Sequence, residues 1–421
     1  MIDTYTSPDR LLSAGELWRR YFTDPIRIIC YLMTILVLSY GSRIDDQSPL
    51  IVPFLESIVG VAFTGIELVM LVILLLELIR RLVLRDFEME RSVVALPMIW
   101  IAIIMGAVPF VRMLIVEMGF RFPLELLEMP WLVGSFFLWL LVYRRQEIHA
   151  MLWMVMIAGL YKSFEGIVIY LRVGLGWGLL TGWRDALLLS MMVLGAFFAF
   201  LIKPEGDKVY QRVRIFFFLL LPGSMFTFIG STRRSYVLGA IVAIGLLIFY
   251  LNRNERFRVY SRAIPIALLC CAGAMVALGS TQLIDRFISV SDNPGTESSG
   301  LYRVIEFYSV SQDVAQRPLF GWQMGRAWTN RTLLDVEQVS NVVPHNTYLY
   351  VLWRSGAFGM LFWLWVMITM FRMHHRTIRA ARTPFMRFLA IWLASGTIAV
   401  STAGFAMSIT ADRLKNFLDA N

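Results

Sequence analysis

Residues 346–371, NTYLYVLWRSGAFGMLFWLWVMITMF, indicate the fold class of this chain. The stretch contains a single charged residue, Arg354, and it is long enough to cross a bilayer, because a membrane helix needs about 20 mostly apolar residues. A strongly basic segment follows, with Arg372, Arg376, Arg379, Arg382 and Arg387. This pattern predicts a membrane-spanning helix that begins near Asn346 and ends at a cationic loop.

Apolar runs of similar length recur along the whole chain. Of its 421 residues, 58% are hydrophobic and only 16% are charged, whereas soluble domains carry about 25% charged residues. We therefore expect an all-α, polytopic transmembrane bundle of about eleven or twelve spans, forming a single domain over residues 1–421. The candidate spans are 25–41, 61–79, 93–111, 123–143, 149–171, 185–202, 213–230, 234–251, 262–281, 346–371 and 386–407.

The charge of the loops predicts the orientation of the chain. One set of loops is rich in arginine and lysine, and the alternate set holds few of them. By the positive-inside rule, the basic set and the N-terminus are cytoplasmic. The side of the C-terminus stays open, because one missed span would reverse it. The basic loops are 80–91, 144–145, 203–214, 253–262 and 372–387.

A long and mostly polar segment, 282–344, then falls on the extracytoplasmic side. It contains a Ser/Asn/Gly/Pro-rich stretch at 289–300, a helix-like run at 301–316, and a turn at 317–318 followed by Gly321. Its many aromatic residues argue against disorder, and loops of this length are usually functional. We expect the chemistry of the protein on this side.

The end of this loop carries His345-Asn346, directly before the helix. On an ideal helix, Gly356 lies within about 20° of His345, and Gly359 lies about 40° to the other side. The spacing predicts an imidazole at the outer mouth of a glycine-lined groove, into which another helix could pack. The alternative is an interfacial histidine above glycines that serve packing alone.

Three arginines on the external side are candidates for binding an anion. Arg233 and Arg234 lie in a short external turn, and Arg303 lies in the helix-like run of the long loop. The planar guanidinium group suits recognition of phosphate. Two alternatives stay open: Arg233 and Arg234 could reach lipid headgroups, and Arg303 could pair at the surface with Glu306.

Other polar residues have a structural interpretation. Lys162 and Glu165 lie in one predicted span, as a structural ion pair or as part of a substrate cavity. Arg354 lies about 180° around the helix from His345, so we assign it to structure or headgroups. We interpret His374-His375 as solvated charge in a basic loop.

The net charge of +9 would suggest a nucleic-acid partner in a soluble chain. Here the topology of the loops accounts for it, so we expect no nucleic-acid partner. On the external side, Asp45-Asp46 is the one carboxylate pair. We expect neither a metal nor another cofactor.

Together these features resemble the O-antigen ligase and polymerase superfamily of bacterial membrane glycan transferases. In that family, the largest external loop precedes a helix that begins with His-Asn, followed nine residues later by Gly-x-x-Gly. His345-Asn346, nine intervening residues and Gly356-Ala-Phe-Gly359 match this pattern without a gap. The resemblance covers about residues 230–372, and the remainder matches only as generic helices.

A family arginine that follows Ser or Thr at the outer end of an earlier helix also has a counterpart. The stretch 232–235, TRRS, resembles it; we align Arg233 with that arginine, and Arg234 is the alternative. Arg303, ahead of the PLFG turn at 318–321, resembles a second family arginine. Gln323 stands where the family's turn has a further glycine, so the chain departs from the pattern there.

The resemblance implies an enzyme of the bacterial inner membrane whose active site faces the periplasm. Its donor would be a glycan on undecaprenyl diphosphate, and its acceptor a lipid A-core or a growing glycan. Arg233, Arg234 and Arg303 would bind the diphosphate, and His345 would be the general base on the acceptor hydroxyl. Residues in supporting positions are Asn346, Gly356 and Gly359.

Several functions share these features. A ligase and a polymerase use the same donor, and this sequence does not separate them. A lipid-linked-sugar flippase or transporter usually shows paired repeats and charges along several spans, whereas this chain shows no repeat and gathers its charges at one face. A non-catalytic scaffold would make the spaced His-Gly-Gly pattern a coincidence.

Overall fold

The computed structural model describes residues 25–39, 65–84, 100, 148–173, 183–231, 234–277, 298–322, 328–331, 337–340 and 346–406. Within these ranges the chain is mostly helical, with short turns between helices and an antiparallel hairpin of β1 (Trp328–Arg331) and β2 (Glu337–Ser340). The expected all-α fold class is confirmed for the described residues. The hairpin is a local exception that no sequence pattern predicted.

Helices occupy the predicted spans for which residues are described. They are α2 (Pro25–Ser39), α4 (Gly65–Leu84), α9 (Ile148–Val173), α10 (Trp183–Leu201), α11 (Lys208–Gly230), α12 (Arg234–Leu247), α14 (Ile264–Ala277), α17 (Thr347–Ala380) and α18 (Pro384–Ala406). Of these described helices, α9, α11, α17 and α18 are long and apolar enough to cross a membrane. Predicted spans 93–111 and 123–143 lie outside the described residues, apart from Trp100, so the number of spans stays a prediction.

Some of the predicted loops are helical. In the predicted loop 253–262, α13 (Arg253–Arg258) leads through the π-helical η5 (Val259–Ala263) into α14, whereas the 3-10 turn η4 (Ile248–Tyr250) ends the predicted span 234–251. The helix α17 continues through its arginine-rich part to Ala380 instead of ending at 371. Arginine is a good helix former, so a basic composition marks the edge of the apolar span but not the end of the helix.

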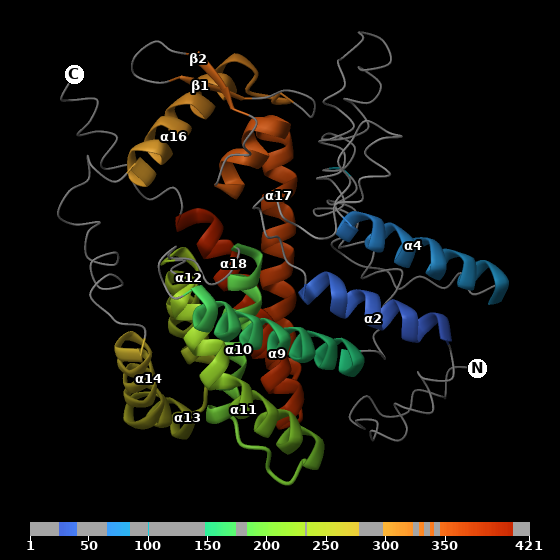
Figure 1. The fold of residues 1–421 in the computed structure, drawn as a ribbon, viewed down its shortest axis with the longest axis vertical. Coiled ribbons are helices and arrows are strands. Elements are labelled where there is room, and N and C mark those ends of the chain that lie inside the picture. Colours follow the sequence, from blue (N-terminus) through green and yellow to red (C-terminus); the bar gives the residue numbers. More distant parts are fainter. Residues whose placement is uncertain are drawn as a thin grey trace.

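The centre of the bundle is formed by α10, α11, α12 and α18, and α9 packs on α11 (Figure 1). Trp392 lies parallel to Phe388 with ring centroids 6.2 Å apart, and Phe217 of α11 meets Trp392 edge-on at 5.4 Å. All three rings are buried. In a bilayer, such contacts stabilise by close packing rather than by removal of apolar surface from water.

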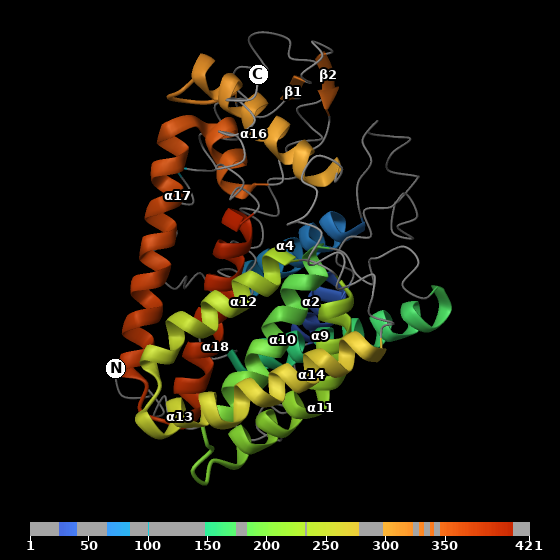
Figure 2. The same ribbon diagram turned by 90° about the vertical axis from the view of Figure 1, so that its left-hand side faces the viewer.

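The two ends of α17 carry different neighbours. The loop helix α16 (Ser298–Gln316) and the hairpin lie beyond its N-terminal end, whereas α13 and the start of α11 lie near its other end (Figures 1 and 2). The described part of the long loop and the basic segments 203–214, 253–262 and 372–387, which charge asymmetry assigned to opposite sides, therefore lie at opposite ends of α17. Which end faces the cytoplasm stays a prediction.

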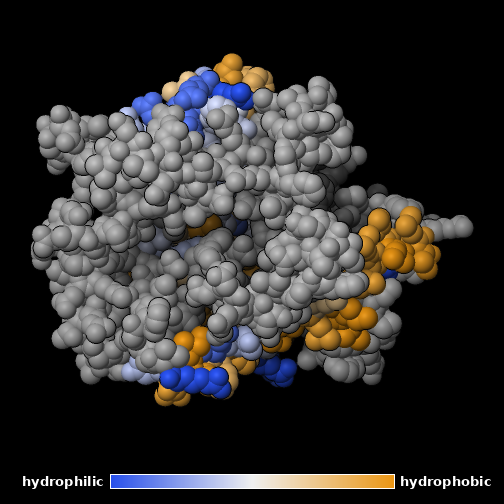
Figure 3. Space-filling model, turned by 45° about the horizontal axis from the view of Figure 1, so that its top comes forward, coloured by the Kyte–Doolittle hydropathy of each residue, from blue (hydrophilic) through white to orange (hydrophobic). Residues whose placement is uncertain are grey.

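The lateral surface is apolar where a lipid contact is expected. On α4, the exposed side chains are Leu75, Leu78, Ile79, Leu82 and Val83. Figure 3 shows apolar surface on the side of the molecule where α4 lies in Figure 1. Exposed leucine and valine in such numbers are compatible with a membrane protein.

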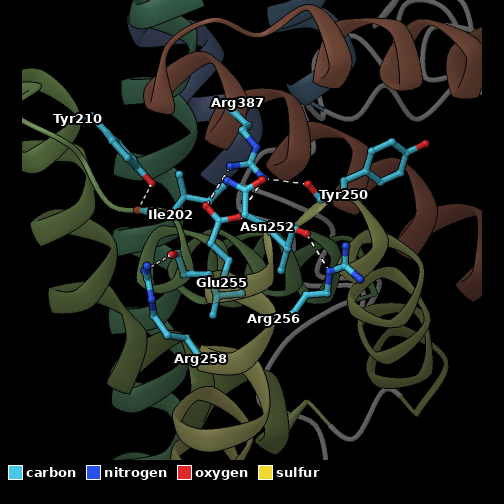
Figure 4. Close-up of polar contacts among 10 residues, drawn as sticks. Ile202, Tyr210, Tyr250, Asn252, Glu255, Arg256, Arg258 and Arg387 are labelled. Carbon is cyan, nitrogen blue, oxygen red and sulfur yellow. Dashed lines mark hydrogen bonds and ion pairs between the residues drawn. The ribbon is translucent and has the colours of Figure 1, made fainter.

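Side-chain hydrogen bonds connect the helices at the basic end of the molecule, near α13 (Figure 4). Arg387 of α18 donates to both carboxylate oxygens of Glu255, at 2.9 and 2.8 Å, and to the Tyr250 carbonyl at 2.8 Å. Glu255 also accepts a hydrogen bond from the backbone N–H of Asn252 at 2.7 Å, and Asn252 is the N-cap of α13. Arg258 donates to the Leu201 carbonyl at the end of α10. The network joins three helix ends through charge-assisted bonds.

The expectation of solvated histidines at this end is wrong. His374 and His375 lie within α17; the ring of His374 bonds to Thr397 of α18, and His375 bonds to the Tyr250 hydroxyl. Because α17 continues past residue 371, both histidines lie on the helix beside its neighbours, and their rings are half-buried instead of solvated.

Candidate functional site

The residues assigned to chemistry are only partly described by the structure. His345 and Arg233 lie outside the described residues. Arg234 begins α12 and Arg303 lies in α16, but their side chains are outside the described part as well. Their convergence on one substrate therefore stays a prediction. The supporting residues Asn346, Gly356 and Gly359 are all described.

Asn346 is the N-cap of α17. Its side-chain oxygen accepts from the backbone N–H groups of Tyr348 at 2.9 Å and Leu349 at 3.2 Å, and the residue is buried. Asparagine is a favoured N-cap because it satisfies amides that have no partner in the first turn. These two bonds fix the start of α17 at Asn346, which directly follows His345 in the sequence.

Gly356 breaks α17. Its φ of 62° and ψ of −162° are non-helical, so two helical segments meet there. The angular relation that the sequence suggested between His345 and the two glycines assumed a continuous helix, and that assumption is wrong. A glycine is needed at Gly356, because a Cβ there would overlap the Leu319 carbonyl and lie 2.6 Å from the Gly321 nitrogen.

The space at the break is filled by the turn 317–321, which follows α16, and not by another helix. Its residues and Trp322 satisfy backbone groups that the break leaves without helical partners. The bonds are Trp322 N–H to the Trp353 carbonyl (2.8 Å), Ala357 N–H to the Pro318 carbonyl (2.8 Å) and Phe358 N–H to the Leu319 carbonyl (3.2 Å). The two motifs noted in the sequence, PLFG and Gly-x-x-Gly, are thus partners in one junction.

The second glycine of this junction is Gly321. Its φ is 63°, in the left-handed region that glycine adopts without strain. A Cβ there would lie 2.5 Å from the Trp353 carbonyl oxygen and 2.6 Å from the Gly356 nitrogen. Gly359 has a smaller role: a Cβ there would overlap the side chain of Ser355, which bonds to the Val351 carbonyl.

Side chains of α16 extend the junction. The Trp322 indole N–H donates to the Asp313 carbonyl at 2.7 Å, and the Arg317 guanidinium lies 4.3 Å above the Trp322 ring. Glu306 is buried, at 2% exposure, rather than at the surface. A buried carboxylate needs a compensating partner. Arg303 precedes Glu306 by three residues on the same helix, and the pairing of the two side chains stays a prediction.

Two further charged groups have structural surroundings. The buried Arg354 guanidinium lies 4.1 Å from the Trp353 ring centre and 5.7 Å from that of Tyr350, which agrees with the structural assignment. Lys162 and Glu165 form an ion pair at 2.6 Å, with 4% and 22% of their side chains exposed. The neighbouring Ser163 bonds to Ser224 of α11. The ion pair itself is thus confirmed, and the choice between a structural and a substrate-cavity role stays a prediction.

The sequence does not predict the junction, because its two glycines, Gly321 and Gly356, lie far apart along the chain. The available signals were a glycine inside an apolar helix and a glycine after a proline-containing turn. Each indicates special backbone geometry, but nothing in the sequence pairs one with the other.

Comparison of the chain with models of protein families, with curated proteins and with solved structures found no match.

Proposed function

We propose that this chain is a membrane glycan transferase of the O-antigen ligase type. It moves a glycan from undecaprenyl diphosphate to a hydroxyl of a lipid A-core, or of a growing glycan, at the outer face of a bacterial inner membrane. The observation that best supports this is the junction between the turn 317–321 and the break at Gly356. It brings α16, which contains Arg303, against the helix that directly follows His345.

In the proposed reaction, His345 removes the proton from the acceptor hydroxyl. The hydroxyl oxygen attacks the sugar carbon that is bonded to the diphosphate, and the carbon–oxygen bond to the diphosphate breaks with inversion. Arg233 and Arg303 balance the negative charge that develops on the departing diphosphate, with Arg234 as the alternative to Arg233. Because arginines supply the charge, this mechanism requires no metal.

The scaffold contributes position rather than chemistry. Asn346 starts α17 beside His345 through its cap bonds. The bonds of Trp322, Ala357 and Phe358 hold the turn against the same helix. Small displacements of reacting groups reduce rates strongly, so a backbone junction between the two candidate segments is a suitable support for a site shared by loop and helix.

The test is transfer by purified protein in lipid nanodiscs. Undecaprenyl-diphosphate glycan is supplied with a lipid A-core acceptor in one reaction and a second repeat unit in another. Transfer to the first acceptor identifies a ligase, and chain extension identifies a polymerase. No transfer to either acceptor, together with movement of the donor across proteoliposomes, would replace the proposal by a flippase.

A further inference from the structure

The turn 317–321 presents apolar side chains where a water-exposed loop would carry polar ones. Leu319 is 55% exposed and Phe320 is 54% exposed. The Phe320 ring packs against that of Phe358 of α17, with ring centroids 5.1 Å apart, and Phe358 is itself 41% exposed. A contiguous exposed apolar patch generally marks a contact with a partner or a membrane.

This patch continues the exposed apolar face of α17. Beyond Phe358, the exposed residues Leu361, Trp365 and Ile368 follow at helical spacing. They belong to a helix long and apolar enough to cross a membrane. The turn therefore adds its apolar side chains to the end of a surface that faces lipid if α17 spans the bilayer.

The length of α17 sets the depth of the turn. Phe358 lies about 21 Å along the helix axis from the exposed Arg372, at about 1.5 Å per residue, and about 27 Å from Arg376. The hydrocarbon core is about 30 Å thick. If either arginine marks one edge of the core, Phe358 lies inside the other edge. Tilting the helix would place Phe358 deeper still.

Irregular backbone at membrane depth needs partners for its polar groups, and some of the groups of this turn have them. Pro318 has no N–H group, and its carbonyl accepts from Ala357. The Leu319 carbonyl accepts from Phe358, and Gly321 donates to the Arg317 carbonyl at 3.1 Å.

We propose that the turn 317–321 is inserted into the leaflet nearer the long loop, with Leu319 and Phe320 among lipid acyl chains. The loop helix α16 is then anchored to the membrane surface at its C-terminal end. Two observations support the insertion: the exposure of Leu319 and Phe320, and the continuity of the patch with the apolar face of α17. It does not depend on the proposed transfer reaction.

Spin-label accessibility tests the proposal on the full chain in nanodiscs. In a background without Cys30, Cys270 and Cys271, Leu319→Cys and Phe320→Cys are each labelled with a nitroxide. Collision with oxygen reports lipid, and collision with a water-soluble nickel chelate reports water. Leu361→Cys is the lipid control and Gln312→Cys, on the exposed face of α16, is the water control.

We expect the ratio of oxygen to nickel accessibility at 319 and 320 to match that at 361 and to exceed that at 312 severalfold. A ratio like that at 312 would overturn the proposal. Low accessibility to both reagents would also overturn it, because a second protein surface would then cover the patch. The two positions are independent, so one poorly folding variant leaves the test intact.

Discussion

The two ends of α17 are held by different kinds of contact. At the N-terminal end, the turn 317–321 and the helix break are joined by backbone hydrogen bonds, which the glycines Gly321 and Gly356 permit. At the C-terminal end, side chains make the connections, above all Glu255 with Arg387. A side chain added at Gly321 or Gly356 would disrupt the first set of contacts, whereas loss of the charge of Glu255 or Arg387 would disrupt the second.

The two kinds of contact have different consequences, one for the position of the candidate site residues and the other for the stability of the fold. A backbone junction fixes the separation of two segments to within the length of a hydrogen bond, which suits segments that carry candidate site residues. A side-chain network holds helix ends together but leaves more freedom to each side chain. We therefore expect that transfer per folded molecule responds only to substitutions at the loop end, whereas stability responds to substitutions at both ends.

Apart from His345, the largest effects that distinguish the two ends of α17 are expected for arginine. Arg233→Lys and Arg303→Lys keep the charge but lose the forked donors, so transfer should fall by about 100-fold at unchanged melting temperature. Arg256→Lys at the basic end, where its Nε donates to the Leu251 carbonyl, is the matched control and should transfer normally. If Arg303→Lys and Arg303→Ala are both fully active, Arg303 leaves the mechanism and pairing with Glu306 becomes its role.

The next effect concerns the glycine junction. Gly356→Ala and Gly321→Ala should each destabilise by about 3 kcal/mol, because a side chain is strained at positive φ and meets backbone atoms. Gly245→Ala is the control, since a Cβ there meets nothing within 4 Å; it should be neutral or stabilising by up to about 1 kcal/mol. Thermal unfolding in nanodiscs measures both. Equal stability of Gly356→Ala and Gly245→Ala would contradict the junction.

A smaller effect is expected at the basic end. Glu255→Gln or Arg387→Gln should destabilise by about 2 kcal/mol, because each leaves its partly buried partner without a counter-charge. The double variant should lose less than the sum of the two. Transfer per folded molecule should stay at the wild-type rate. A variant that lost transfer but kept its stability would show that the two ends are not separate.

The smallest effect sharpens the role of Asn346. Asn346→Ala removes the cap and should destabilise by about 1 kcal/mol, whereas Asn346→Ser keeps a capping oxygen and should lose only a few tenths of a kcal/mol. Unfolding measurements on the pair separate capping from other roles. Equal damage in both variants would mean that the asparagine side chain does more than start the helix.

Among the described residues, hydropathy predicted which segments are helices, but it did not predict where they end. The helix start at Asn346 was predictable because an apolar run begins there after a favoured capping residue. The end at Ala380 was not, because a hydropathy pattern reports membrane depth, whereas arginine continues a helix outside the membrane. The run 301–316 was predicted as helical, and α16 covers Ser298–Gln316.

The features at the loop end depended on contacts between distant residues. The sequence predicts that Gly356 is a packing glycine in an apolar helix. In the structure its φ is positive, and the carbonyls of Pro318 and Leu319 accept from the two backbone N–H groups that follow it. The hairpin of β1 and β2 shows no clear alternation of apolar residues. Such tertiary contacts override local pattern, so the candidate residues were visible in the sequence and their junction was not.

The most direct test of the central claim is the rate of glycan transfer by a folded His345→Ala protein. If His345 is the general base at the loop end, the rate falls by about 10² to 10⁴, while insertion, melting temperature and donor binding stay close to wild type. His375→Ala, near the opposite end of the same helix, should transfer normally once corrected for folded protein. A folded His345→Ala protein that transfers glycan at the wild-type rate would contradict the claim.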